Sequence, residues 1–134
     1  MGRALVIVLD THAWVWWLTK PEKIPAKAMR ALRKTPRIGI AAISVWEIAA
    51  KAERGKLKFN RPYDLWLEEA LTVDPRAELL HLSPRISIEA ARLSWEHGDP
   101  ADRFIVSTAR AYDASLVTAD EAIHDSGLIR CIWD

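Results

Sequence analysis

Five acidic residues lie where the strands of a parallel sheet are expected to end, or where the next helices begin. They are Asp10, Glu47, Asp99, Asp102 and Asp120. In open parallel sheets the ligand crevice lies beyond the carboxyl ends of the strands. Carboxylates gathered there repel one another, and burial raises their pKa values instead of keeping them ionised. A divalent cation removes this conflict, because Mg²⁺ and Mn²⁺ prefer carboxylate and water oxygens.

Such a cation would point to phosphate chemistry. Mg²⁺ held by a few carboxylates keeps bound waters and takes further ligands from a substrate phosphate, so it can activate a water and neutralise a phosphodiester transition state. Residues 1–61 contain 13 Lys and Arg against 4 Asp and Glu, whereas residues 62–134 contain 6 against 14. A basic half suits a polyanionic ligand. The residues therefore predict phosphodiester hydrolysis on a nucleic acid. Zinc is not expected, because the chain has no HExxH motif and no Cys/His pair at zinc spacing.

Basic residues also recur at helical spacing near the start of the chain. The stripe consists of Lys20, Lys23, Lys27, Arg30, Lys34 and Arg37, three or four residues apart. One interpretation is a solvated helix face, and the other is a surface that contacts RNA phosphates. On the second interpretation the candidate RNA-binding residues are Lys23, Lys27, Arg30 and Lys34.

Each acid also has an ordinary structural explanation. Asp10, Asp99 and Asp120 are placed to cap the helices that follow them. Ser44 and Glu47 match the S-x-x-E capping box, in which Glu47 would bond the backbone N–H of Ser44. Glu47 could also pair with Lys51 four residues on, and Asp102 would favour the positive end of its helix.

The fold class follows from strands that alternate with helices and lack hairpin turns. Apolar runs predict strands at 4–9, 38–43, 79–82, 115–118 and 128–132. Helices are expected at 11–18, 44–54, 64–71, 84–96 and 119–125, between Pro25 and Pro36, and from Pro100 onward with Asp99 as cap. This order predicts a three-layer α/β/α domain with a central, mainly parallel sheet.

The composition bounds the class of protein. The chain has 134 residues, half of them hydrophobic and 28% charged. This predicts a single folded domain spanning 1–134 and excludes a disordered chain. The single cysteine, Cys131, is expected to be a small buried hydrophobic residue in a protein of a reducing compartment. No apolar run is long enough to span a membrane or serve as a signal peptide, so a soluble cytoplasmic protein is expected.

The segments around the acids carry a more specific signal than their spacing. They read LDTH at 9–12, SVWEIAAK at 44–51, GKL at 55–57, DPADRFI at 99–105 and VTAD at 117–120. In order and spacing, over essentially the whole chain, they resemble PIN-domain proteins, and specifically the VapC toxins of type II toxin–antitoxin systems.

This resemblance implies a PIN fold and a Mg²⁺- or Mn²⁺-dependent endoribonuclease. It also implies a homodimer and inhibition by a VapB-type antitoxin whose tail obstructs the site. The family's acidic quartet falls on Asp10, Glu47, Asp102 and Asp120, with Asp10 and Asp102 as primary metal ligands. Asp99 is assigned chiefly to capping.

Other residues near the acids have two interpretations each. Thr11 and Thr118 could orient a carboxylate or a water, or act as ordinary caps and strand-end hydroxyls. Lys51 could contact RNA phosphate or pair with Glu47. His12 is expected to be structural, since a metal-activated water needs no general base.

The tryptophans are divided between core and interface. Trp14, Trp16 and Trp17 cannot all enter one core face, so some should line an interface with a second protomer or the antitoxin. The core or half-buried set is expected to be Trp46, Trp66, Trp95 and Trp133.

Two other classes of protein fit the sequence less well. A non-catalytic PIN-like module that binds RNA or protein has no reason to keep four repelling carboxylates. A phosphatase of the haloacid dehalogenase type needs Asp-x-Asp after the first strand, where this chain has His12.

Overall fold

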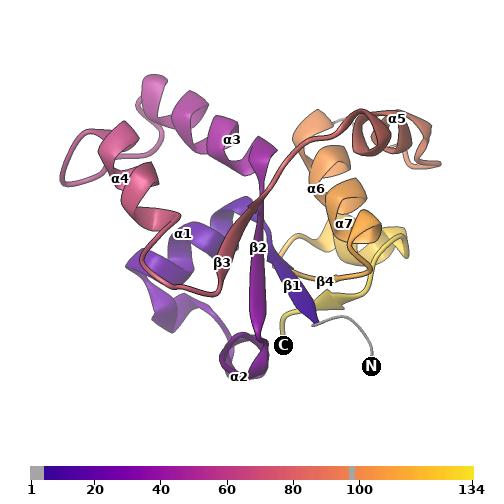
Figure 1. The fold of residues 1–134 in the computed structure, drawn as a ribbon, viewed down its shortest axis with the longest axis horizontal. Helices are drawn as coiled ribbons and strands as arrows, with labels where there is room; N and C mark the ends of the chain where they lie inside the picture. The colour runs from indigo at the N-terminus through magenta and orange to yellow at the C-terminus, as the bar shows by residue number, and fades with distance from the viewer. Residues whose placement is uncertain (1–4, 97–98) are drawn as a thin grey trace.

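The computed structural model describes residues 5–96 and 99–134 (Figure 1). Its centre is a five-stranded sheet in the order β3-β2-β1-β4-β5. All neighbouring strands are parallel. The strands are β1 (Val6–Leu9), β2 (Arg37–Ala41), β3 (Ala77–Leu80), β4 (Ser115–Val117) and β5 (Cys131–Ile132). The predicted fold class is confirmed, with a sheet that is parallel throughout.

Helices cover both faces of this sheet (Figure 1). They are α1 (Thr11–Thr19), α2 (Ala26–Lys34), α3 (Ala42–Glu53), α4 (Tyr63–Ala70), α5 (Pro84–Arg92), α6 (Pro100–Ala111) and α7 (Glu121–Ser126), with a 3₁₀ turn η1 (Pro21–Lys23) before α2. Helices α1 to α4 pack on one face, α6 and α7 pack on the other, and α5 lies against α6. None of the helices in the described ranges is long and apolar enough to cross a membrane.

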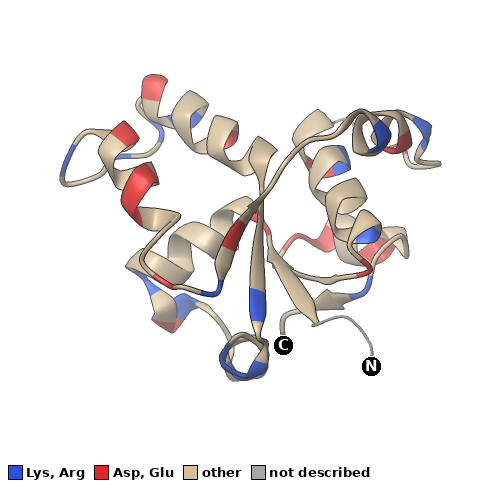
Figure 2. Cartoon of the chain, viewed as in Figure 1, with Lys and Arg blue, Asp and Glu red and all other residues tan. Residues whose placement is uncertain are grey.

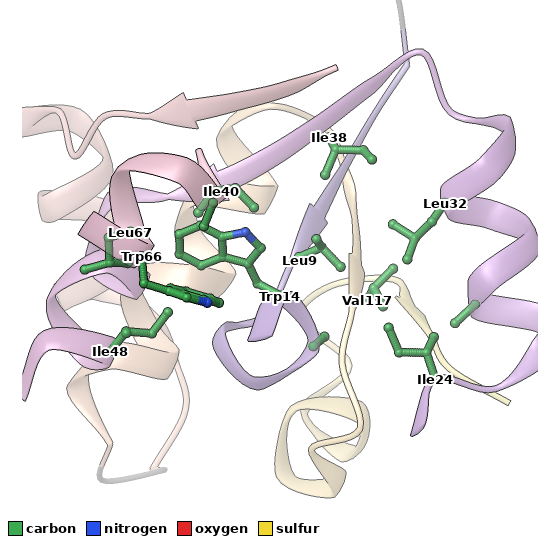
Figure 3. Close-up of a cluster of buried hydrophobic side chains, with 13 residues drawn as sticks. Leu9, Trp14, Ile24, Leu32, Ile38, Ile40, Ile48, Trp66, Leu67 and Val117 are labelled. Atoms are coloured by element: carbon green, nitrogen blue, oxygen red, sulfur yellow. The ribbon is translucent and has the colours of Figure 1, made fainter. Parts of the chain in front are cut away.

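Alternation along the strands divides the core into two layers. In β1, Val6 and Val8 point to the α6 side, while Leu9 points to the side of α1 to α4. Leu116 and Val117 of β4 divide in the same way. Figure 3 shows the larger layer, in which the Trp14 and Trp66 rings lie among the aliphatic side chains of the sheet and helices.

Several helices and strands begin or end at other residues than the sequence predicted. The apolar run at 38–43 is not one strand, because β2 ends at Ala41 and α3 begins at Ala42. Helix α5 ends at Arg92 instead of residue 96. Its C-terminal carbonyls accept hydrogen bonds from the Arg103 guanidinium, which bonds Ala90 O at 3.1 Å and Leu93 O at 2.8 Å.

The carboxyl ends of the parallel strands lie at one edge of the sheet, called here the carboxyl edge, and their amino ends lie at the opposite, amino edge. The carboxyl ends of β1 and β2 lead into α1 and α3, and the carboxyl end of β4 leads to Asp120. Helix α2 precedes β2 and lies at the opposite, amino edge (Figure 1). Residues that follow parallel strands are therefore brought to one edge of the sheet, while α2 is kept away from it.

Candidate functional site

Asp10 is the buried centre of the carboxyl edge. The residue is 3% exposed, and its Oδ1 accepts a 2.7 Å hydrogen bond from the Thr11 backbone N–H. Its Oδ2 accepts a 2.5 Å bond from Thr118 Oγ1, and its backbone N–H donates to Val117 O at 3.0 Å. Asp10 is thus both the cap of α1, as the sequence allowed, and the link between the ends of β1 and β4.

Glu47 is connected to the same centre through Thr11. Thr11 Oγ1 lies 2.5 Å from Glu47 Oε1 and 2.8 Å from Ser44 Oγ. A hydroxyl carries one proton, so Thr11 donates it to the Glu47 carboxylate and accepts from Ser44. Burial is the main cause that raises the pKa of Glu47, and the charges of Asp10 and Asp99 raise it further.

The capping-box explanation of Glu47 is wrong. Helix α3 is preceded by Ala41 as its cap, so Ser44 lies inside the first turn and its hydroxyl is fully buried against Thr11. The alternative ion pair with Lys51 is also not formed: Lys51 lowers the pKa of Glu47 through its charge, without an ion pair within 4.0 Å in the described part of the chain.

Asp120 joins the centre from the end of β4. Its backbone N–H donates a 3.0 Å hydrogen bond to Thr118 Oγ1, the hydroxyl that bonds Asp10. Its side chain accepts from the Ile123 N–H, which confirms Asp120 as the cap of α7. The charges of Asp10 and Asp120 both help to raise the pKa of the Cys131 thiol to about 11, after burial as the main cause. The two carboxyls therefore share one neighbourhood.

Asp99 and Asp102 lie at the start of α6, and the charge of Asp99 helps to raise the pKa of Glu47. Asp99 caps α6 by accepting from the Ala101 N–H at 3.0 Å, as predicted, and its side chain is exposed. Asp102 lies in the first turn of α6 and is 8% exposed. Arg103, next to it, bonds the end of α5 and so fixes this turn against the neighbouring helix.

The donor chemistry fits a divalent cation, although the carboxyls are not arranged as a ready coordination shell. Within residues 5–96 and 99–134, no group of three or more His, Cys, Asp or Glu is close enough to hold a metal ion. Asp10, Glu47 and Asp120 nevertheless have no Lys or Arg within ion-pair distance in these ranges. Among the ion pairs of the described residues, one involves these acids: His12 Nδ1 lies 3.5 Å from Asp10 Oδ2. Burial and the charges of Asp10 and Asp99 raise the pKa of Glu47, so its carboxylate is one that a bound cation would stabilise.

A pocket of about 500 Å³ opens beside this edge, between α3 and α6. Its apolar lining consists of Ile43, Trp46, Pro100, Ala101 and Phe104. Glu47 and Asp99 contribute carboxyls to it, and Lys51 and Arg54 contribute cations. Neither Trp46 nor Arg54 was predicted as a site residue. Arg54 lies seven residues after Glu47, a spacing that places both on one helix face. Trp46 directly precedes Glu47, so no spacing in the sequence predicted its place in the pocket.

The predicted basic stripe lies elsewhere. Lys27, Arg30 and Lys34 are exposed on α2, at the amino edge of the sheet (Figure 2). Lys23 lies in η1, with its Nζ 5.3 Å from the Trp16 ring centre. The structure therefore does not bring the stripe to the acids, whereas Lys51 and Arg54 line the pocket that contains Glu47 and Asp99.

The tryptophans divide between core and partly exposed positions as predicted, with the exception of Trp46. Trp14 is fully buried and Trp66 nearly so, while Trp16 and Trp17 are half-buried on α1. Trp95 and Trp133 are half-buried, as expected. The prediction for Trp46 is wrong, because 59% of it is exposed.

Comparison with known proteins identifies the family of this fold and site. The family described as PIN domain matches residues 7–127, which include all five acids. The chain belongs to the PIN-domain family. Among curated PIN-domain relatives, the chain is 30% identical over 118 residues to Ribonuclease VapC22 of Mycobacterium tuberculosis. That match covers 87% of this chain and 88% of the relative.

Solved structures of VapBC complexes share the PIN fold described above. VapBC2 from Rickettsia felis, bound to a DNA fragment from its promoter, matches with a TM-score of 0.70 at 22% identity, covering 97% of this chain and all of that one. VapBC-1 from nontypeable Haemophilus influenzae matches with a TM-score of 0.63 at 18% identity, covering 95% and 96%. At these identities the structures establish the fold alone.

Proposed function

We propose that this PIN-domain protein is a metal-dependent endoribonuclease that acts in the cytoplasm as the toxin of a toxin–antitoxin pair. The observation that carries the proposal is the continuous link from Glu47 through Thr11 to Asp10, and from Asp10 through Thr118 to Asp120. Its chemistry agrees with the ribonuclease name of the relative with 30% identity.

In this proposal Asp10 and Asp102 hold Mg²⁺ or Mn²⁺, with Glu47 and Asp120 beside them. When bound, the ion would activate a water and stabilise the negative charge that develops on the scissile phosphate. Thr118 and Thr11 keep the carboxylates of Asp10 and Glu47 oriented toward the edge of the sheet, because each donates its hydroxyl proton to one of them.

The proposed protein partner of this chain rests on the solved structures that it resembles. The R. felis and H. influenzae structures are VapBC complexes, which supports a VapB-type antitoxin as the partner of this chain. The half-buried Trp16 and Trp17 on α1 are candidates for the contact with a second protomer or with the antitoxin. The basic residues of α2 are proposed to contact phosphates remote from the scissile bond.

The test is cleavage of total RNA by the wild type and by Asp10→Asn, with Mg²⁺ or Mn²⁺ present and the cleaved bonds mapped. The matched control is Asp64→Asn, because Asp64 is an exposed acid on α4, away from the carboxyl edge. We expect cleavage by the wild type and Asp64→Asn, and loss of cleavage in Asp10→Asn. Cleavage by Asp10→Asn at the wild-type rate would refute the proposed site.

A further inference from the structure

Apart from Glu47, the residues that line the pocket between α3 and α6 have no role in the hydrolysis proposed above. We propose that it binds the base of an unpaired RNA nucleotide next to the scissile phosphate, with the Trp46 ring as its stacking surface. This inference rests on the proposed ribonuclease function and adds how the substrate is held.

The walls of the pocket suit a flat aromatic group. Trp46 comes from α3 and Phe104 from α6, and the space between these helices measures about 500 Å³. That size lies within the range of sites for small ligands. Pro100 and Ala101 add apolar surface from the first turn of α6. Nucleobases stack on aromatic side chains whatever their sequence, since every base presents a π face.

Contacts within this chain leave most of the Trp46 side chain uncovered. With 59% of its surface accessible, Trp46 is the most exposed aromatic side chain in the described ranges and leaves a large apolar area in water. The other six tryptophans are buried or half-buried. Covering the indole with a base would remove this area from water, which is favourable.

The charges around the pocket are those expected for a nucleotide. Lys51 and Arg54 line it from the same face of α3 that carries Glu47, at spacings of four and seven residues. A strand whose base lies on Trp46 would have a phosphate within reach of these cations. Glu47, the residue shared by the pocket and the acidic centre, bonds Thr11 next to Asp10. A base held there is adjacent to the proposed site of hydrolysis.

The proposal restricts the substrate. A base inside a duplex is already stacked and paired, so it must be extruded before it can stack on Trp46. Unpaired loops and single strands need no such step. The chain should therefore prefer bonds that flank an unpaired nucleotide.

The experiment measures RNA binding and base stacking in the Asp10→Asn variant, which is expected not to cleave RNA. Single-stranded RNA decamers of mixed sequence, each with one 2-aminopurine ribonucleotide, are titrated with the Asp10→Asn protein in the presence of Mg²⁺. The fluorescence of 2-aminopurine reports stacking, and anisotropy reports affinity. In this background, Trp46→Ala should weaken binding on the order of tenfold and abolish the quenching at one position.

Two further variants make the result specific. Trp46→Phe keeps an aromatic face and should retain most of the quenching and affinity. Ile88→Ala removes a side chain that is 48% exposed on α5, outside the pocket, and should behave as the parent protein. Thermal melts confirm folding, which Trp46→Ala should preserve because the side chain is on the surface.

The outcomes separate this inference from the proposed function. If the wild type cleaves RNA and Trp46→Ala leaves affinity, quenching and cleavage unchanged, the stacking role is refuted while the nuclease stands. If Trp46→Ala instead weakens binding of a purified VapB-type antitoxin and leaves RNA binding intact, the pocket is a protein-binding site and the inference is also wrong. If the wild type does not cleave RNA, both proposals fail.

Discussion

Thr118 Oγ1 donates a hydrogen bond of 2.5 Å to Asp10 Oδ2, across a separation of 108 residues in the chain. The same hydroxyl accepts from the Asp120 N–H at 3.0 Å. A single side chain therefore joins the ends of the adjacent strands β1 and β4 and sets the position of two acids. Because Thr118 is fully buried, water cannot replace either bond.

The first prediction concerns this hydroxyl. Thr118→Val keeps the shape of the side chain but leaves Oδ2 of the buried Asp10 carboxylate without its donor, which should cost about 2 kcal/mol of folding stability. RNA cleavage should fall as well, because Asp10 is no longer held. Thr118→Ser, which keeps the hydroxyl, should restore most of both. Urea unfolding and cleavage rates measure the two effects, and equal values for the Val and Ser variants would contradict the assigned bond.

A second prediction follows from the raised pKa of Glu47. Burial makes the ionised carboxylate less favourable in the folded chain than in the unfolded one. This penalty is absent below the ordinary Glu pKa of 4.5 and grows as the pH rises through the raised value. Without metal, Glu47→Gln should therefore gain stability relative to the wild type between pH 4 and pH 7.5, and should lose most of its RNA cleavage.

Urea unfolding at the two pH values measures this difference. The Gln side chain can still accept the Thr11 hydroxyl proton, so the comparison isolates the charge. A stability difference that does not change with pH would show that Glu47 is not penalised by burial. Normal cleavage by Glu47→Gln would remove it from the proposed site.

The third prediction concerns the cation. A metal that binds only the folded chain should raise its stability by about 2.7 kcal/mol at a hundredfold excess over Kd. Thermal melts with and without Mg²⁺ or Mn²⁺ should show this increase for the wild type and for Asp64→Asn. Asp10→Asn should lose most of it. The same increase in all three proteins would place the metal outside the acidic centre.

A fourth prediction distinguishes the two basic surfaces. Lys51→Glu with Arg54→Glu should weaken the binding of a short RNA and reduce the salt dependence of that binding, because both cations line the pocket beside Glu47. Lys27→Glu with Arg30→Glu, on α2, should weaken only the binding of long RNA that reaches the amino edge. Anisotropy with a decamer and with a long RNA, at several salt concentrations, compares the pairs. A decamer that responds equally to both pairs would rule out this division.

The sequence predicted the sheet because its strands are short apolar runs that alternate with helices. It also predicted the capping roles of Asp99 and Asp120, which depend on neighbouring backbone groups only. Local patterns sufficed for these features, since each involves residues within a few positions of one another.

The missed features depend on contacts between distant elements. The boundary between β2 and α3 falls inside one apolar run, so the sequence did not show that it lies at Ala41. For the same reason the capping box, the alternative structural role offered for Glu47, is wrong. The exposure of Trp46 depends on how far α6 stands from α3, which no local pattern reports. The stripe on α2 has helical spacing, but spacing does not reveal which edge of the sheet the helix occupies.

The parallel strand order has a consequence for protein synthesis. Asp10 leaves the ribosome first, and Thr118, which delivers the hydrogen bond to it, is synthesised 108 residues later. Until then the nascent polypeptide lacks the hydroxyl that orients Asp10 and the acid that stands next to it. If the mature protein cuts RNA, this delay would protect the messenger and the ribosome that are producing it.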